Sequence, residues 1–280
     1  MSGAALTDRH AVVTGASGGL GRALCAELLA ACARVSALDI DRDALLGMRE
    51  ADASGRLLTE TLDITDPAAC ARTFAALREG QGPIDLLVNN AGITHFSAVA
   101  DTEASTIAQV MAVNFLGAVH CAQSALPDLR ARRGQLVVLS SVAGFAPLYG
   151  RSAYSASKHA LHGFFETLRA ETVEDGMNVL LVCPSFIATQ RDHPDARSPY
   201  DGAARPGGAR ATVGEVMQPE DAARAIMAAI RARRRTLLLG RVAKQSHWVR
   251  RLWPGLYERI MIRSARREVV VDAPPEPGAR

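Results

Sequence analysis

The stretch that decides the fold is residues 10–21, HAVVTGASGGLG. It opens with a β-branched apolar run typical of a buried strand and continues through glycines into a helical pattern. Glycines at such a corner permit a tight turn and close backbone approach, and the helix N-terminus presents free N–H groups to a phosphate. The stretch predicts a pyrophosphate-binding turn made of Gly15, Ser17, Gly18, Gly19, Leu20 and Gly21.

The same alternation of strand and helix continues outward along the chain. Further β-rich runs lie at residues 34–40, 57–64, 84–89, 135–140, 178–183 and 236–240. Helical patterns lie at 19–31, 67–78, 101–132, 152–174 and 219–233, and the third is expected to bend near residues 114–117. Strands that alternate with helices form parallel sheets covered on both faces. We therefore expect an α/β fold, a doubly wound, parallel, seven-stranded Rossmann-like sheet, as a single domain over residues 1–240.

Composition favours a soluble globular protein, which we expect in the cytoplasm. Of 280 residues, 48% are hydrophobic and 22% are charged. We find no apolar run near the roughly 18 residues that a membrane span needs, and no secretory signal. The cysteines are scattered among apolar neighbours, which predicts reduced core residues and neither a metal site nor a disulfide framework. They are Cys25, Cys32, Cys70, Cys121 and Cys183.

Charge is unevenly placed. Residues 231–280 hold 13 basic and four acidic residues, whereas residues 1–230 hold 19 basic and 25 acidic ones. An acidic body with a basic tail suggests an interaction role for the tail. We expect no nucleic-acid partner, because no zinc-finger, RNA-motif or basic-zipper signature is present.

Two segments stand apart from the alternating pattern. Residues 190–218 lack periodicity and are rich in Gly, Pro and Arg, which predicts a substrate lid or a disordered segment. Residues 241–280 form a basic, amphipathic C-terminal extension with an expected disordered end at 272–280. Within it, residues 246–267 interleave Trp248 and Trp253 with arginines and are broken at Pro254. Such a helix packs on its own body, covers the substrate entrance, docks on a partner subunit or makes a peripheral membrane contact.

The end of the second strand bears on cofactor choice. Asp39 lies there, where a carboxylate accepts hydrogen bonds from the adenosine ribose diol and repels a 2′-phosphate. Gly18 supplies no cation for such a phosphate. This pattern favours NAD(H) as cofactor, and Arg42 keeps NADP(H) open as the alternative.

The pair Tyr154 and Lys158 is the sharpest catalytic candidate. The i, i+4 spacing puts both side chains on one helical face. A tyrosine is a poor base at neutral pH unless a cation stabilises its phenolate. Lys158 and Lys244 are the only lysines among 32 basic residues, so lysine chemistry is indicated at Lys158. Ser141 follows the strand at 135–140 and is expected at the same carboxyl edge of the sheet.

Together these motifs resemble those of the short-chain dehydrogenase/reductase (SDR) family over about residues 8–240. Besides TGASGGLG (14–21) and Tyr154-x-x-x-Lys158, the chain carries LDIT (62–65), NNAG (89–92), VNF (113–115), SS (140–141) and PSFIAT (184–189) in the family's order. One departure is visible, since the family usually has glycine where this chain has Ser185.

The resemblance implies a role for each matching residue. Ser141 would hold the substrate oxygen, Tyr154 would exchange a proton with it, and Lys158 would bind the nicotinamide ribose and depress the tyrosine pKa. Asn114 would hold a water that links the lysine to solvent. The implied cofactor contacts are Asp63 with the adenine amino group, Asn90 in support of the cofactor-side strand, Ile187 and Thr189 with the carboxamide, and Ile64, Ala91, Gly92 and Pro184 beside them.

The sequence gives two conflicting hints about the substrate. Four aromatic residues follow motifs near the active end and predict an apolar pocket: Phe96, Phe145, Tyr149 and Phe186. The lid carries arginines that suggest an anionic substrate group: Arg191, Arg197, Arg205 and Arg210. Both remain open at this point.

We therefore expect an NAD(H)-dependent oxidoreductase that transfers a hydride between nicotinamide and a small-molecule secondary alcohol or ketone, one that is hydrophobic. The alternatives are an NADPH-dependent carbonyl reductase and a non-catalytic dinucleotide-sensing protein. The family resemblance implies a homodimer or homotetramer, formed chiefly through residues 101–132 and 152–174.

Overall fold

The computed structural model describes residues 6–31, 33–188 and 216–271. Its strands are β1 (His10–Thr14), β2 (Arg34–Asp39), β3 (Leu57–Thr61), β4 (Leu86–Asn89), β5 (Gln135–Leu139), β6 (Asn178–Pro184) and β7 (Thr236–Leu239). Its helices are α1 (Gly19–Ala30), α2 (Arg42–Glu50), α3 (Pro67–Gln81), α4 (Ala104–Met111), α5 (Gly117–Ala131), α6 (Ser152–Glu171), α7 (Pro219–Arg231), α8 (Arg241–Leu252) and α9 (Pro254–Val271). Shorter turns are η1 (Val99–Asp101), η2 (Ala112–Leu116) and η3 (Val142–Gly144).

Within these residues the strands form one seven-stranded sheet in the order β3-β2-β1-β4-β5-β6-β7. Every neighbouring pair is parallel, and Val12 of β1, for example, lies between Ser36 of β2 and Leu87 of β4. The doubly wound Rossmann-like sheet is confirmed. The strand order reverses between β1 and β4, which is where ligands bind in open α/β sheets.

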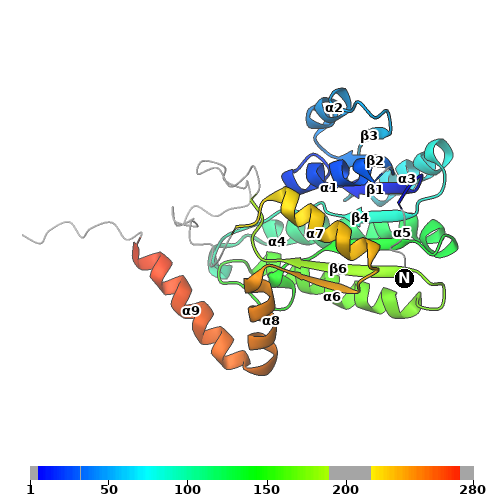
Figure 1. Cartoon of the computed structure of the whole chain (residues 1–280). Coiled ribbons are helices and arrows are strands. Elements are labelled where there is room, and N and C mark those ends of the chain that lie inside the picture. The colour runs from blue at the N-terminus through cyan, green and yellow to red at the C-terminus, as the bar shows by residue number, and fades with distance from the viewer. Residues whose placement is uncertain (1–5, 32, 189–215, 272–280) are drawn as a thin grey trace, which may run out of the picture.

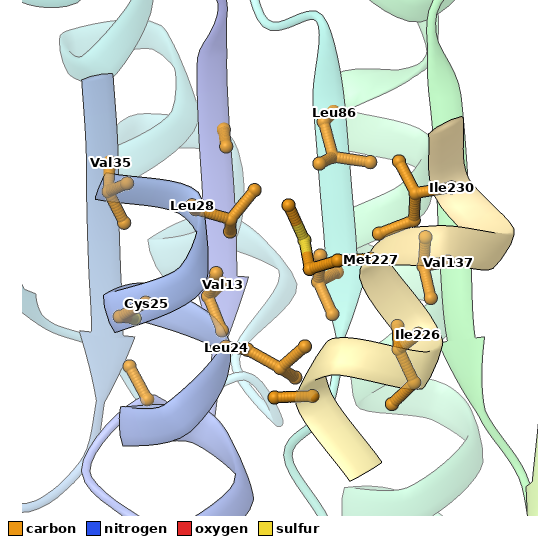
Figure 2. Packing of buried hydrophobic residues seen from close by; sticks show 14 of the residues in the cluster. Val13, Leu24, Cys25, Leu28, Val35, Leu86, Val137, Ile226, Met227 and Ile230 are labelled. Atoms are coloured by element: carbon orange, nitrogen blue, oxygen red, sulfur yellow. The ribbon is translucent and has the colours of Figure 1, made fainter. Parts of the chain in front are cut away.

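Both faces of the sheet are apolar, because successive residues of a strand point to opposite sides. On one face, Val13 of β1 lies near Leu24 and Leu28 of α1 and Ile226 and Ile230 of α7 in one buried cluster, seen in Figure 2. Figure 1 shows α1 and α7 side by side over this face, and the two helices are in contact.

The opposite face is covered by α3, α5 and α6. Phe74 of α3, Leu129 of α5 and Phe165 of α6 are fully buried there against strand residues such as Val12 and Leu136. The packing of these side chains therefore fixes the position of α6 on the sheet. Helix α6 bears Tyr154 and Lys158.

The long helix of residues 104–131 bends where the sequence predicted. Its α4 and α5 parts are joined by the π-helical turn η2, in which Asn114 is buried. π-helical turns occur frequently at functional sites. The whole helix Ala104–Ala131 is long and apolar enough to cross a membrane by length and composition, contrary to our expectation of no such run. Its buried residues, such as Cys121 and Leu129, pack in the core of the α/β fold.

Helix α2 was not predicted. Its N-cap is Asp41, whose carboxylate accepts a hydrogen bond from the backbone N–H of Ala44. Only Leu45 and Met48 are buried, at a spacing of three residues. Two apolar positions in nine residues are too few for a periodicity argument, so only the cap could have revealed this helix.

The C-terminal extension forms α8 and α9, which break at Trp253–Pro254 as the sequence predicted. Figure 1 shows α8 leaving the end of the sheet and α9 running away from the body of the fold. The expected lid at 190–218 lies outside the described residues except for residues 216–218, and the expected disordered end at 272–280 lies outside them altogether.

A buried histidine makes the stability of the fold sensitive to acid. His10 is fully buried, its Nδ1 lies 2.9 Å from the Gly82 carbonyl oxygen, and its Nε2 lies 2.9 Å from the Ser36 hydroxyl. Burial lowers the pKa of His10 below its ordinary value of 6.5. Burial also lowers the pKa of His162. The unfolded chain therefore takes up these protons at a higher pH than the folded chain does, and stability falls as the pH drops below 6.5.

We expect the melting temperature to fall between about pH 7.5 and pH 5, and His10→Gln to make that fall shallower. Thermal unfolding at a series of pH values measures both slopes, with His159→Gln, at an exposed position of α6, as the control for loss of a histidine. An unchanged slope in His10→Gln would show that other groups govern the acid response.

Candidate active site

The candidate residues gather at one edge of the sheet. Because all strands are parallel, the carboxyl ends of β1, β2, β4, β5 and β6 lie on the same side. The glycine turn follows β1, Asp39 ends β2, Asn90 follows β4, and Ser141 follows β5. The edge therefore brings together segments that are far apart in the sequence.

The glycine turn requires glycine at Gly15. Its φ of +63° lies in the left-handed region, and a Cβ there would come within 2.6 Å of the Ala91 Cα. At Gly21 a Cβ would come within 2.2 Å of the Gly15 carbonyl oxygen. The first turn of α1 therefore packs directly on the loop, which leaves the loop's outer side to a ligand.

Side chains at the carboxyl ends of β1 and β4 hold the glycine turn in place. Asn90 donates its amide hydrogens to the carbonyl oxygens of Thr14 (3.1 Å) and Gly15 (2.9 Å). The Thr14 hydroxyl accepts the backbone N–H groups of Asn90 (3.1 Å) and Ala91 (3.2 Å). Asn90 thus supports the cofactor-side turn, whereas Thr14 was missed because its partners are backbone groups of a distant strand.

Asp39 lies directly beside the turn. One carboxylate oxygen accepts the Ser17 backbone N–H at 2.9 Å and the other accepts the Asp41 N–H at 3.2 Å. The side chain is half-buried, and each oxygen keeps a further lone pair for a ligand. Arg42 is exposed at the first residue of α2. The carboxylate is thus hydrogen-bonded directly to a backbone N–H group of the turn.

The two other residues predicted near the adenine lie in the loop after β3. The Asp63 side chain is exposed and accepts hydrogen bonds from the backbone N–H and the hydroxyl of Thr65. Ile64 is buried, and its carbonyl oxygen lies 3.0 Å from His120 Nδ1. The carboxylate is thus available at the surface, while the adenine contact stays a prediction.

Asn114 connects the loop after β4 with helix α6. Its carbonyl oxygen accepts the Ile93 N–H at 2.8 Å, and its amide donates to the Ile93 carbonyl at 2.9 Å and to the Ser157 hydroxyl at 3.0 Å. Ser157 in turn donates to the Tyr154 carbonyl at 2.8 Å. Asn114 and Ser157 therefore tie the strand β4 loop to the helix that carries Tyr154. Ser157 was not predicted, since only the fold brings it to Asn114.

Lys158 is buried beside Tyr154. Its ammonium donates a hydrogen bond to the Leu139 carbonyl at 2.7 Å and lies 5.6 Å from the centre of the Tyr154 ring. Burial lowers the pKa of Lys158, and the neighbouring Tyr154 opposes that shift. A Cβ at Gly92 would lie 3.7 Å from the ammonium. The two candidate catalytic residues are thus adjacent, and a loop glycine leaves space next to the lysine.

Ser141 follows β5 two residues after the carbonyl that holds Lys158. It is buried, and its hydroxyl oxygen accepts the Ala143 N–H at 3.1 Å, which caps η3. That bond leaves the hydroxyl proton of Ser141 for another acceptor. The serine is therefore held in place by its own loop before any substrate arrives.

A polar network lies behind Ser140 and was not predicted. The Ser140 hydroxyl contacts His162 Nε2 at 3.0 Å and donates to the Lys158 carbonyl at 3.5 Å. On the other side of the ring, His162 Nδ1 lies 3.6 Å from a Glu166 carboxylate oxygen. Cys183 Sγ lies 3.7 Å from Nε2, the nitrogen that also contacts Ser140. Burial raises the pKa of Cys183 to about 12, so the thiol is protonated. Ser140 is a structural neighbour that supports the turn of α6 bearing Lys158.

The segment after β6, residues 185–188, lies at the same carboxyl edge of the sheet. The Ala188 N–H donates to the Met217 carbonyl and the Met217 N–H donates to the Phe186 carbonyl, so residues 186–188 pair with the chain before α7. Ser185 replaces the family's usual glycine, and its backbone N–H donates to the Leu239 carbonyl at 3.1 Å. Pro184 ends β6 and Ile187 is half-buried, whereas Thr189 lies outside the described residues.

A cavity of about 460 Å³ lies between the loop after β4 and the loop before α6, and its lining includes neither Tyr154 nor Ser141. Of the four aromatic residues predicted to form a pocket, Tyr149 lines it. Phe96 lies against Gly150 with the Arg151 guanidinium 5.5 Å over its ring, and Phe145 packs on α8 near Ala243 and His247. The lining residues are Ser97, Ala98, Val99, Pro147, Leu148, Tyr149, Gly150, Ser152 and Ser155.

Phe96, Phe145 and Phe186 therefore do not line this cavity, contrary to our prediction. Phe145 follows Ser141 closely in the sequence, but its ring faces the C-terminal extension, a contact that no local pattern could reveal. Phe186 is half-buried and is placed by the pairing with Met217.

Comparison with known proteins agrees with this arrangement. The family model described as short chain dehydrogenase matches residues 9–198. The chain is 33% identical over 267 residues to dehydrogenase/reductase SDR family member 7B of Bos taurus, covering 92% of this chain and 81% of that protein. It is 33% identical over 277 residues to dehydrogenase/reductase SDR family protein 7-like of Anopheles gambiae, covering 94% and 84%.

A solved structure shows the same likeness. The crystal structure of a short-chain dehydrogenase from Streptomyces avermitilis superposes with a TM-score of 0.78 at 28% identity, covering 95% of this chain and 98% of that one. The family model's range of residues 9–198 includes the glycine turn and the helix with Tyr154 and Lys158. The chain is therefore an enzyme of the short-chain dehydrogenase/reductase family.

Proposed function

We propose that the protein is an NAD(H)-dependent oxidoreductase that interconverts a hydrophobic secondary alcohol and the matching ketone. The observation that carries the cofactor preference is the Asp39 carboxylate, 2.9 Å from the Ser17 N–H of the glycine turn. The pair of Tyr154 and Lys158 carries the reaction type.

The residues at the edge fit a nicotinamide dinucleotide. Helix α1 begins at Gly19, directly after the turn, and the backbone N–H groups of its first turn would hold the pyrophosphate. Asp39 would accept the hydroxyl groups of the adenosine ribose, and Lys158, next to the space at Gly92, would meet the nicotinamide ribose. When bound, the nicotinamide supplies or accepts the hydride.

The protein's own part of the reaction is to hold the substrate oxygen and to move one proton. Ser141 would donate a hydrogen bond to that oxygen from its fixed place at the end of β5. In oxidation the Tyr154 phenolate takes the hydroxyl proton, and in reduction the Tyr154 hydroxyl donates it. The buried ammonium of Lys158 stabilises the phenolate by its positive charge. Asn114 and Ser157 keep the helix in register with the loop after β4.

The choice of NAD(H) rests on like-charge repulsion. A 2′-phosphate next to Asp39 would place two negative groups together, which disfavours NADP(H). The alternative is an NADPH-dependent carbonyl reductase, favoured by the exposure of Arg42 only three residues from Asp39. Membership of an enzyme family and the complete set of Ser141, Tyr154 and Lys158 leave no support for a non-catalytic sensor.

The walls of the cavity support a hydrophobic substrate. Ala98, Val99, Pro147 and Leu148 supply apolar surface, whereas Ser97, Ser152 and Ser155 supply a few hydroxyl groups. A mostly apolar pocket with few polar groups is typical of a site for a hydrophobic small molecule. The arginines that suggested an anionic substrate lie at residues outside the described part of the chain.

Members of this family typically form oligomers, and we propose a homodimer or homotetramer through α4, α5 and α6. Leu116 is 45% exposed on this long helix pair, and Phe115 packs on Phe164 of α6 with ring centres 5.9 Å apart. A second copy would cover that surface.

The test is a thermal-shift titration with NADH and NADPH. A ligand that binds only the folded state raises its stability, by about 2.7 kcal/mol at a hundredfold excess over Kd. We expect NADH to raise the melting temperature more than NADPH does. Asp39→Asn is expected to weaken NADH binding about 10- to 100-fold, because it removes a charge-assisted hydrogen bond. It should also reduce the difference between the melting-temperature shifts with NADH and with NADPH.

The matched control is Asp43→Asn, which removes the same charge at an exposed position in the first turn of α2. It should leave both shifts unchanged. A larger shift with NADPH in the unaltered protein would replace this proposal with the carbonyl reductase.

A further inference from the structure

The C-terminal helices expose five large apolar side chains. We call their surface the hairpin face, defined by Trp248, Leu252, Trp253, Leu256 and Ile260. Their exposed fractions are 57%, 55%, 58%, 48% and 49%. Trp248 and Leu252 are four residues apart on α8, and Leu256 and Ile260 are four residues apart on α9, so each helix turns one apolar stripe to solvent.

The opposite face of the same helices is packed on the body. Ala243 is buried with Val142 and Ala146, and the His247 ring lies 5.1 Å from that of Phe145. On α9, the Tyr257 hydroxyl donates a hydrogen bond to the Pro147 carbonyl at 3.1 Å. These contacts fix the orientation of both helices, so the exposure of the hairpin face follows from the fold.

Basic residues surround the hairpin face. Residues 241–263 carry Arg241, Lys244, Arg250, Arg251, Arg259 and Arg263 against the single acid Glu258. An amphipathic helix with Trp and Leu on one side and Arg on the flanks is the pattern of a segment that lies in the interface of an anionic bilayer. Tryptophan prefers the headgroup level of a membrane.

We propose that the hairpin face docks on the surface of an anionic lipid bilayer, with its apolar side chains inserted and its arginines among the headgroups. The positive charge around the hairpin face favours a lipid bilayer over a second copy of the chain. Two hairpin faces that met across a two-fold axis would bring their arginines together, whereas anionic headgroups neutralise them.

Docking would also place the cavity near the lipid. Pro147 lines the cavity and holds Tyr257 of α9, so the same short loop joins the bilayer-binding helices to the substrate wall. As a deepening of the proposed function, on which this step rests, the substrate is an alcohol or ketone that dissolves in the membrane.

The two tryptophans make the test direct. Trp248 and Trp253 are the only tryptophans of the chain, and both belong to the hairpin face. Intrinsic fluorescence of the full-length protein therefore reports on this face without a label. We expect a blue shift and sedimentation with vesicles of phosphatidylglycerol and phosphatidylcholine, neither effect with phosphatidylcholine alone, and weaker binding in about 0.5 M salt, which screens the charges. An unchanged emission with the anionic vesicles would overturn the proposal.

Two double variants distinguish the insertion of apolar side chains from the electrostatic attraction of the arginines. Both variants keep the tryptophans. Leu252→Ser with Ile260→Ser should weaken sedimentation at least tenfold at every salt concentration. Arg251→Glu with Arg259→Glu should abolish the preference for anionic vesicles. The matched controls are Val173→Ser, 57% exposed after α6, and Arg72→Glu, exposed on α3, which should bind as the unaltered protein does.

Two further measurements distinguish a loss of membrane docking from a loss of folding, of cofactor binding or of self-association. The thermal shift with NADH should be the same in all variants, since none of these residues belongs to the cofactor site, and it would survive a failure of docking. Light scattering in the absence of lipid gives the mass in solution. An oligomer that dissociates in Leu252→Ser with Ile260→Ser would assign the face to a second copy and overturn the proposal.

Discussion

Tyr154→Phe is expected to lower kcat about 10²- to 10⁴-fold, the usual contribution of a positioned acid or base. The substitution removes one hydroxyl and keeps the ring that lies 5.6 Å from the Lys158 ammonium. It leaves the glycine turn and Asp39 untouched, so NADH should bind as before. The measurement is kcat for a secondary alcohol that the unaltered enzyme oxidises, together with the thermal shift by NADH.

The control is Tyr149→Phe, which removes the same hydroxyl from an exposed tyrosine of the cavity wall. It should affect KM for the substrate more than kcat. If Tyr154→Phe kept half of the activity, Tyr154 would not be the group that moves the proton.

Gly15→Ala is expected to cost both stability and cofactor binding. The added Cβ would lie 2.6 Å from the Ala91 Cα, so the turn must shift away from β4. Overpacking of this kind costs about 1–3 kcal/mol, in addition to about 1–2 kcal/mol for a left-handed residue other than glycine. Because the shifted turn would no longer aim its N–H groups, we expect the thermal shift by NADH to vanish. Denaturant unfolding and the NADH titration measure the two effects.

Gly55→Ala separates the two costs. Gly55 has a φ of +66°, nearly that of Gly15, but nothing lies within 4 Å of its added Cβ. It should therefore lose only the backbone contribution and keep the NADH shift. Equal losses in the two variants would show that the contact with Ala91 is unimportant.

Much of the fold could be predicted because a buried parallel strand leaves a strong trace in the sequence. Runs such as LVVL at 136–139 are apolar at every position, since both faces of the sheet are covered, and all seven strands lie within the β-rich stretches that the sequence indicated. Helix α2 left a weaker trace, because it buries only Leu45 and Met48. Its existence depends on the Asp41 cap and on packing against the sheet.

The site could be predicted as far as its side chains follow local rules. Tyr154 and Lys158 lie four residues apart on one helix, and the glycine turn lies between a strand and a helix, so spacing alone indicates them. The supports of the site obey no such rule. The Leu139 carbonyl that holds Lys158 is a backbone group, and Thr14 and Ser157 act on partners that only the sheet brings near.

The shared packing of α1 and α7 has a consequence for synthesis on the ribosome. Leu24 and Leu28 leave the ribosome early, but Ile226 and Ile230, which cover the same face of the sheet in Figure 2, follow about 200 residues later. At about 5–20 residues per second, the delay is about 10–40 s. During that time the nascent chain lacks the α7 side chains that cover this apolar face of the sheet. Folding is therefore completed only after nearly the whole chain has been made.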